Sequence, residues 1–144
     1  MLVRQLLENK PKNFVETVSE IQSLSDVVRR LAELKIGAVV VTDGDGVVVG
    51  IISERDIVRQ LAAQGPSCLS SAVRDTMTKS VISARPEDVA EDLLGKMTAG
   101  RFRHMPVVDG GELVGILSIG DVVKARMDAM TAENEALEGM IRGF

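Results

Sequence analysis

Two serine–aspartate pairs with identical spacing are the residues of this chain best suited to chemistry. Each closes a segment that reads Gly, two apolar residues, Ser, two variable residues and Asp. A carboxylate offers two acceptor oxygens to two adjacent hydroxyl groups, and the amide groups of a helix N-terminus can bind an anion. The same spacing is that of a helix capping box, so a purely structural role is the alternative. The pairs are Ser53 with Asp56 and Ser118 with Asp121.

Basic residues form a second candidate group. Arg103 and His104 lie just before a predicted strand, and arginine can bind phosphate oxygens with two parallel hydrogen bonds. A solvated basic loop is the alternative. The chain contains two repeats, and each contains one of the Ser–Asp pairs. In the first repeat, the corresponding residues Gly37 and Ala38 are uncharged, although that repeat carries Arg55. The two sites are therefore not expected to be equivalent.

The first repeat must position one of these pairs. Its apolar patterns predict the order strand, helix, strand, strand, helix. The turn sequence Asp43–Gly46 lies between two apolar runs and predicts a hairpin. The predicted elements are a strand over residues 14–18, a helix from Ser23 to a left-handed cap at Gly37, strands over residues 38–42 and 47–52, and a helix from Ser53 to about Gln64.

The second repeat follows the first at a nearly constant offset. Val41 corresponds to Val107 at an offset of 66, and Asp56 corresponds to Asp121 at an offset of 65. The one-residue difference falls in the hairpin turn, where a repeat tolerates it. The predicted elements are a strand over residues 81–83, a helix with Pro86 in its first turn, a hairpin of strands 105–108 and 112–117, and a long last helix from Ser118.

Composition limits the class of protein. Of 144 residues, 45% are hydrophobic, but Trp and Tyr are absent, so the core must be aliphatic. The net charge of −4, with 17 basic and 21 acidic residues, argues against general nucleic-acid binding. The single cysteine, Cys68, excludes an intrachain disulfide and fits a reducing, cytoplasmic location, with an incidental loop thiol as its expected role. No apolar run approaches the roughly 20 residues that span a membrane.

With these motifs, the chain resembles the CBS (cystathionine-β-synthase) domain family, and specifically the tandem pairs that form small stand-alone bacterial proteins. The resemblance covers about residues 11–125. It is carried by Ile36–Val41 and Gly50–Asp56 in the first repeat, and by Arg101–Asp109 and Gly115–Asp121 in the second. It implies an α/β (α+β) fold in which two βαββα repeats, related by a pseudo-twofold axis, form one CBS module.

The expected domain boundaries follow from this resemblance. They are an N-terminal helix or turn at residues 1–10, repeat 1 at 11–64, a linker at 65–75, repeat 2 at 76–125 and a C-terminal helix extension at 126–144. The extension is expected to cover its own domain or to pack on a partner or on the N-terminal helix.

The family resemblance also implies a function. It predicts a non-catalytic regulatory module, a homodimer, that binds AMP, ADP, ATP, NAD(H) or S-adenosylmethionine and signals energy or redox state to a protein partner, with no metal and no required cofactor. One cleft is expected to combine Thr17, Gly37 and Ala38 with Ser118 and Asp121. The other is expected to combine Ser83, Arg103 and His104 with Ser53, Arg55 and Asp56.

The main alternative is a structural interaction module that binds no small ligand. An enzyme is the weakest interpretation, because the sequence shows no nucleophile, metal-ligand cluster or paired acid and base.

Overall fold

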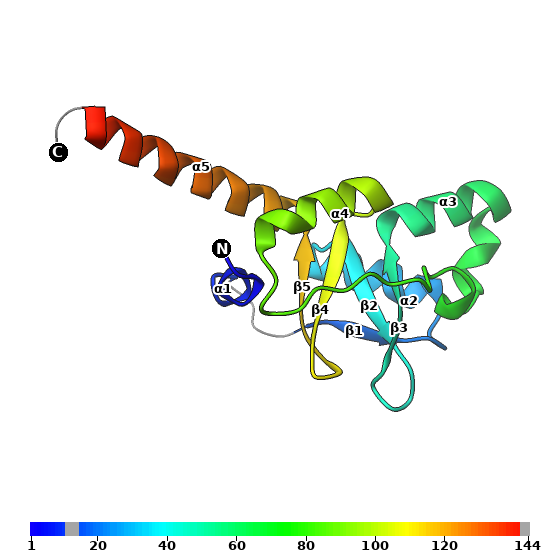
Figure 1. Cartoon of the computed structure of the whole chain (residues 1–144). Helices are drawn as coiled ribbons and strands as arrows, with labels where there is room; N and C mark the ends of the chain where they lie inside the picture. Colours follow the sequence, from blue (N-terminus) through cyan, green and yellow to red (C-terminus); the bar gives the residue numbers. More distant parts are fainter. Residues whose placement is uncertain (11–14, 142–144) are drawn as a thin grey trace. The chain divides into compact units, whose positions relative to one another are not determined.

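The computed structural model describes residues 1–10 and 15–141, which are divided between two compact units (Figure 1). The first-repeat unit comprises residues 14–82 and 110–113. The second-repeat unit comprises residues 1–13, 83–109 and 114–144, so it includes the N-terminal segment. The domain boundaries expected from the sequence remain a prediction.

The first-repeat unit is built on a three-stranded sheet. The middle strand, β2, pairs in parallel with β1 and antiparallel with β3. The predicted hairpin between β2 and β3 is confirmed: the Asp43 carboxylate accepts hydrogen bonds from the backbone N–H groups of Asp45 and Val47, and Gly46 adopts a φ of 79°. The elements are β1 (Thr17–Ser19), α2 (Leu24–Leu34), β2 (Ala38–Thr42), β3 (Val48–Ser53), α3 (Glu54–Gln64) and the 3-10 helices η1 (Pro66–Ser70) and η2 (Val73–Asp75).

An aliphatic core holds this unit together. The segment expected to be a linker contributes Val73 and Cys68 to this core. Cys68 is only 1% exposed, so it is a buried core residue and not the incidental loop thiol expected from the sequence. The buried cluster consists of Val18, Leu24, Val27, Leu31, Val39, Val41, Ile52, Ile57, Cys68 and Val73.

The second-repeat unit has a core of the same aliphatic kind around a two-stranded sheet. Its elements are α1 (Val3–Glu8), η3 (Ala90–Asp92), α4 (Leu93–Gly100), β4 (His104–Asp109), β5 (Glu112–Ser118) and α5 (Ile119–Ile141). Its buried cluster consists of Val3, Leu6, Ala84, Ala90, Leu93, Met97, Met105, Val107, Leu117, Val122 and Ala125.

The N-terminal segment is bound to the second repeat by backbone and side chains. The first N–H groups of a helix lack partners within the helix. Here the N–H groups of Val3 and Arg4 donate to the carbonyl oxygens of Asp88 and Pro86, both at 2.9 Å. Val3 is fully buried. These bonds hold α1 against residues 86–90.

Three expectations about element boundaries are wrong. The helix α2 ends with Lys35 in the left-handed conformation, at φ 54°, instead of Gly37. In the part of the chain that the structure describes, residues 81–83 form no strand, and only Ala84 makes an isolated parallel bridge with Val107. Pro86 does not begin a helix, because its carbonyl is bound to Arg4 and α4 begins at Leu93.

The first strand is shorter than expected. The sequence predicts it over residues 14–18, whereas β1 covers Thr17–Ser19. Phe14, the first residue of the prediction, lies outside the described residues.

Candidate functional site

The first Ser–Asp pair lies where β3 passes into α3. The Ser53 N–H donates to Asp56 Oδ2 at 3.0 Å, and the Asp56 N–H donates to Ser53 Oγ at 3.3 Å. These two bonds form a capping box, so the structural interpretation of the pair is correct. The cap engages Oδ2, which leaves Oδ1 of a half-buried carboxylate outside the reciprocal cap.

The second pair repeats this geometry where β5 passes into α5. The Ser118 N–H donates to Asp121 Oδ2 at 2.8 Å, and the Asp121 N–H donates to Ser118 Oγ at 3.1 Å. Because the cap again engages only Oδ2, capping and binding of a hydroxyl group are compatible roles for the same side chain.

The residues expected to line the clefts adjoin these corners within each unit. The Glu54 N–H donates to the carbonyl oxygen of Gly37 at 2.9 Å, and Ala38 is paired with Ser53 across β2 and β3. In the second-repeat unit, the Ile119 N–H donates to the carbonyl oxygen of Arg103 at 2.7 Å. We call the helix start with its Ser–Asp pair a Ser–Asp corner. In each unit this corner is hydrogen-bonded to the residue just before the first strand of the hairpin, β2 or β4.

The other candidates are placed by their own elements. Thr17 lies in β1 opposite Val40, Arg55 is exposed in the first turn of α3, and His104 is half-buried at the start of β4. Arg103 and Ser83 are also exposed. Both predicted cleft combinations take residues from the two units, and they remain predictions.

A neighbouring segment brings a further side chain to each carboxylate. In the first-repeat unit, Thr78 pairs with Ile51 through both backbone groups, at 3.0 and 2.9 Å. The Thr78 hydroxyl then donates to Asp56 Oδ1 over 3.4 Å, a long and therefore weak hydrogen bond.

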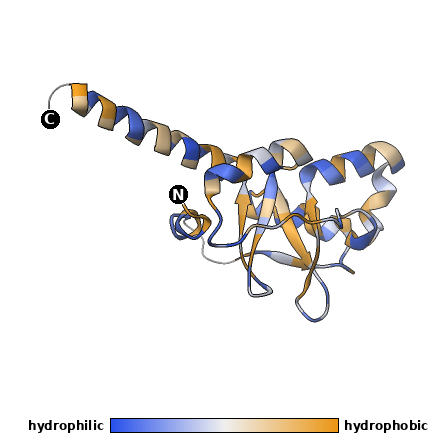
Figure 2. Ribbon diagram, in the orientation of Figure 1, coloured by the Kyte–Doolittle hydropathy of each residue, from blue (hydrophilic) through white to orange (hydrophobic). Residues whose placement is uncertain are grey.

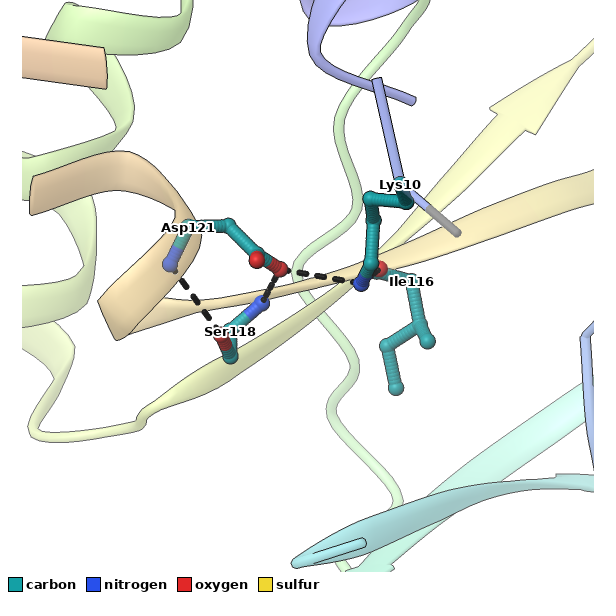
Figure 3. Close-up of polar contacts among 4 residues, drawn as sticks. All are labelled: Lys10, Ile116, Ser118 and Asp121. Atoms are coloured by element: carbon teal, nitrogen blue, oxygen red, sulfur yellow. Dashed lines mark hydrogen bonds and ion pairs between the residues drawn. The ribbon is translucent and has the colours of Figure 1, made fainter. Parts of the chain in front are cut away.

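In the second-repeat unit, the corresponding contact is an ion pair (Figure 3). Lys10 Nζ donates to Asp121 Oδ2 at 2.9 Å and to the carbonyl oxygen of Ile116 at 2.8 Å. The Lys10 and Asp121 side chains are 29% and 25% exposed. Lys10 was not among the candidate residues, because no sequence motif around it indicates a contact with Asp121.

The environment of Asp121 sets its charge. Burial alone would raise the pKa of this carboxyl, but the hydrogen bond from the Ser118 N–H, together with the hydrogen bond and positive charge of Lys10, lowers the pKa below its ordinary value. Asp121 is therefore an anion at neutral pH.

This lowered pKa predicts a dependence of stability on pH. An aspartate whose pKa is lower in the folded state adds stability above its unfolded pKa of about 3.9, and this contribution is lost as pH falls through the folded pKa. Between about pH 5 and pH 3, the free energy of unfolding should fall further in the wild-type chain than in Asp121→Asn. The difference should be at most about 1 kcal/mol, because the ion pair is partly exposed. Urea unfolding across this range measures the difference, and equal losses in both proteins would contradict the assignment.

Comparison with known proteins identifies the family. A family model described as the CBS domain matches residues 3–63 and 73–128. The chain belongs to the CBS domain family. This confirms the resemblance and the mixed α/β fold class predicted from the repeated motifs.

Similar CBS proteins include small bacterial ones. The chain is 48% identical to the CBS-domain containing protein ATU1752 from Agrobacterium tumefaciens, whose crystal structure it matches with a TM-score of 0.83 over 87% of this chain and 92% of that chain. It is 30% identical over 118 residues to the CBS domain-containing protein YhcV of Bacillus subtilis (strain 168), covering 82% of this chain and 83% of that protein. Other relatives are longer: the chain spans 22% of the length of CBSCBSPB2 of Arabidopsis thaliana, at 33% identity over 85% of this chain.

One similar structure contains ligands. The CBS domain pair of protein MJ0100, in complex with 5′-methylthioadenosine and S-adenosyl-L-methionine, is 26% identical, with a TM-score of 0.76 over 90% of this chain and 98% of that chain.

Among the helices of residues 1–10 and 15–141, none combines the length and the apolar character needed to span a membrane.

Proposed function

We propose that this CBS pair is a non-catalytic regulatory module that binds an adenosyl ligand through Asp56 and Asp121. The observation that carries the proposal is a cap of the same kind at both sites, each with a half-buried carboxylate at a helix N-terminus and one oxygen outside the reciprocal cap. The adenosyl ligands of the related MJ0100 pair support this class of ligand.

The chemistry of the corner suits a ribose. The 2′- and 3′-hydroxyl groups are adjacent donors, and a carboxylate is an acceptor with two oxygens. The N-termini of α3 and α5 favour a negatively charged group, since their first amide groups and the helix dipole are both positive there. Arg55, Arg103 and His104 are the side chains we propose for phosphate, with AMP, ADP, ATP or NAD(H) as candidate ligands.

A regulatory role requires that the ligand distinguish two states of the protein. A ligand shifts a conformational equilibrium only by its difference in affinity for the two conformations. A homodimer that reports ligand binding to a protein partner in the cytoplasm remains our expectation for this chain.

The test measures binding while preserving the helix caps. Asp56→Asn and Asp121→Asn each retain an amide oxygen that can replace the cap acceptor, but they remove the charge and one acceptor. Isothermal titration calorimetry of ligand-stripped protein should show AMP, ATP, NAD(H) or S-adenosylmethionine binding to the wild type. The double variant should bind at least about tenfold more weakly, because hydrogen bonds to charged groups are the strong ones.

Asp128→Asn, an exposed change on α5, is the matched control and should bind as the wild type does. If the wild type binds none of these ligands, the proposed function is wrong.

The second candidate function is a structural interaction module. It is favoured by apolar side chains on α5 that are exposed in the second-repeat unit, and the ribbon of α5 has orange, hydrophobic stretches in Figure 2. They are Met127, Met130, Leu137, Met140 and Ile141, which are 49–86% exposed. Adenosyl ligand released from natively purified protein and identified by mass spectrometry would decide against a module that binds no small molecule.

A further inference from the structure

We propose that Lys10 competes with a nucleoside for the carboxylate of Asp121 and so weakens binding there, whereas the Asp56 carboxylate meets the neutral hydroxyl of Thr78. The inference rests on the proposed function, since it concerns the same carboxylates. It assigns a regulatory role to a residue of the N-terminal segment.

The contacts at the two corners carry the argument. In each repeat, a neighbouring segment forms hydrogen bonds with the aspartate and with the backbone of the isoleucine five residues before it. These isoleucines are Ile51 and Ile116. At Asp56 the donor to the carboxylate is the neutral hydroxyl of Thr78, over 3.4 Å. At Asp121 it is the ammonium group of Lys10, at 2.9 Å (Figure 3). A charge-assisted bond at this distance is much stronger than a long neutral one.

The position of Lys10 is fixed by the anchored helix before it. The Lys10 N–H donates to the carbonyl oxygen of Leu7 at 3.2 Å, and the Leu7 side chain covers Gly115 on β5. Upstream, Val3 and Leu6 are buried in the core of the same unit. Lys10 is therefore held near Asp121 at a high effective concentration, as in an intramolecular binding event.

A nucleoside at Asp121 must compete with this ammonium group for the carboxylate. Lys10 donates to Oδ2, the oxygen already used by the cap, and it also neutralises the charge that would attract hydroxyl donors. The pair is about one-quarter exposed, so water and salt weaken it. The expected competition is therefore moderate, about two- to fivefold in affinity.

The experiment isolates the Asp121 site and uses adenosine, which has no phosphate for Lys10 to bind. In an Asp56→Asn background, Lys10→Met should bind adenosine about two- to fivefold more tightly than the background protein in calorimetry. Lys10→Arg, which keeps the charge, and Lys96→Met, an exposed change on α4 of the same unit, should bind as the background does. Thermal unfolding checks that each variant is folded, and Lys10→Gln serves if Lys10→Met is not.

The outcomes separate the two proposals. If adenosine or AMP binds the wild type but Lys10→Met leaves affinity for adenosine unchanged, the competition is wrong and the proposed function stands. Weaker binding by Lys10→Met would instead make Lys10 a ligand contact and would also overturn the competition. If the wild type binds neither adenosine nor any of AMP, ATP, NAD(H) and S-adenosylmethionine, the proposed function fails and the competition fails with it.

Discussion

Leu117→Ala is expected to lower the free energy of unfolding by about 2–5 kcal/mol, the usual cost of removing a buried leucine side chain. Leu117 lies on β5 with no exposed surface and belongs to the buried cluster that includes Met105, Val107 and Val122. Truncation leaves a cavity that a close-packed interior fills only partly. Because a domain is typically stable by about 5–15 kcal/mol, this change removes a large part of the total.

Urea unfolding followed by circular dichroism measures this effect. The matched control is Val114→Ala on the same strand, where the side chain is 39% exposed and the expected change is within about 0.5 kcal/mol. Ile52→Ala is the equivalent core change in the first-repeat unit, where Ile52 is also fully buried. A Leu117→Ala protein no less stable than Val114→Ala would contradict the packing described for the second-repeat unit.

The second large effect is expected at the glycine that opens each repeated motif. A Cβ atom on Gly50 would lie 2.6 Å from Met77 Sδ and 2.9 Å from the backbone oxygen of Thr78. That backbone is fixed by its two hydrogen bonds to Ile51, so it cannot yield cheaply. Gly50→Ala should therefore destabilise the protein by about 1–3 kcal/mol, the range for overpacked cores.

Gly115→Ala is the informative comparison. Its Cβ would approach only the Leu7 side chain, at 2.6 Å, and a leucine can change rotamer. We expect a smaller loss of unfolding free energy than at Gly50. Gly44→Ala, with no atom within 4 Å of the new Cβ, is the control for the substitution itself. A loss at Gly115 that equals or exceeds the loss at Gly50 would show that the fixed backbone of Thr78 is not the deciding contact.

The hairpins and the Ser–Asp corners could be predicted because their signals are local. The turn sequence Asp43–Gly46 lies between two apolar strands, and the serine before α3 sets the start of that helix three residues before Asp56. Both features depend on residues within a few positions of one another. The offset between the repeats then extended the same prediction to Ser118.

The left-handed residues at two helix ends and the role of Pro86 could not be predicted from local patterns. Glycine is the usual left-handed residue at a helix end, so Gly37 was expected where the chain uses Lys35, and Arg101 takes the equivalent conformation at φ 55°. Pro86 suits a helix start, but its carbonyl accepts a hydrogen bond from Arg4. At Pro86, this contact from a distant segment overrides the local preference.

The same limit applies to the candidate site. The carboxylates could be identified from their motif, whereas the donors that meet them could not. Thr78 reaches Asp56 from 22 positions away, and Lys10 reaches Asp121 from 111 positions away. Neither donor belongs to the repeated Gly-to-Asp motif. A difference between the two sites could therefore be predicted from Arg103 and His104, but not from Lys10.

The wide separation of Lys10 from Asp121 also has a consequence for synthesis on the ribosome. At about 5–20 residues per second, the 111 positions between them take roughly 5–20 s to translate. Residues 14–82, most of the first-repeat unit, are complete well before Asp121 is made. We therefore expect residues 14–82 of the nascent chain to fold first. The helix α1 can pack only after the second repeat has been made, so the Lys10 contact should be among the last to form.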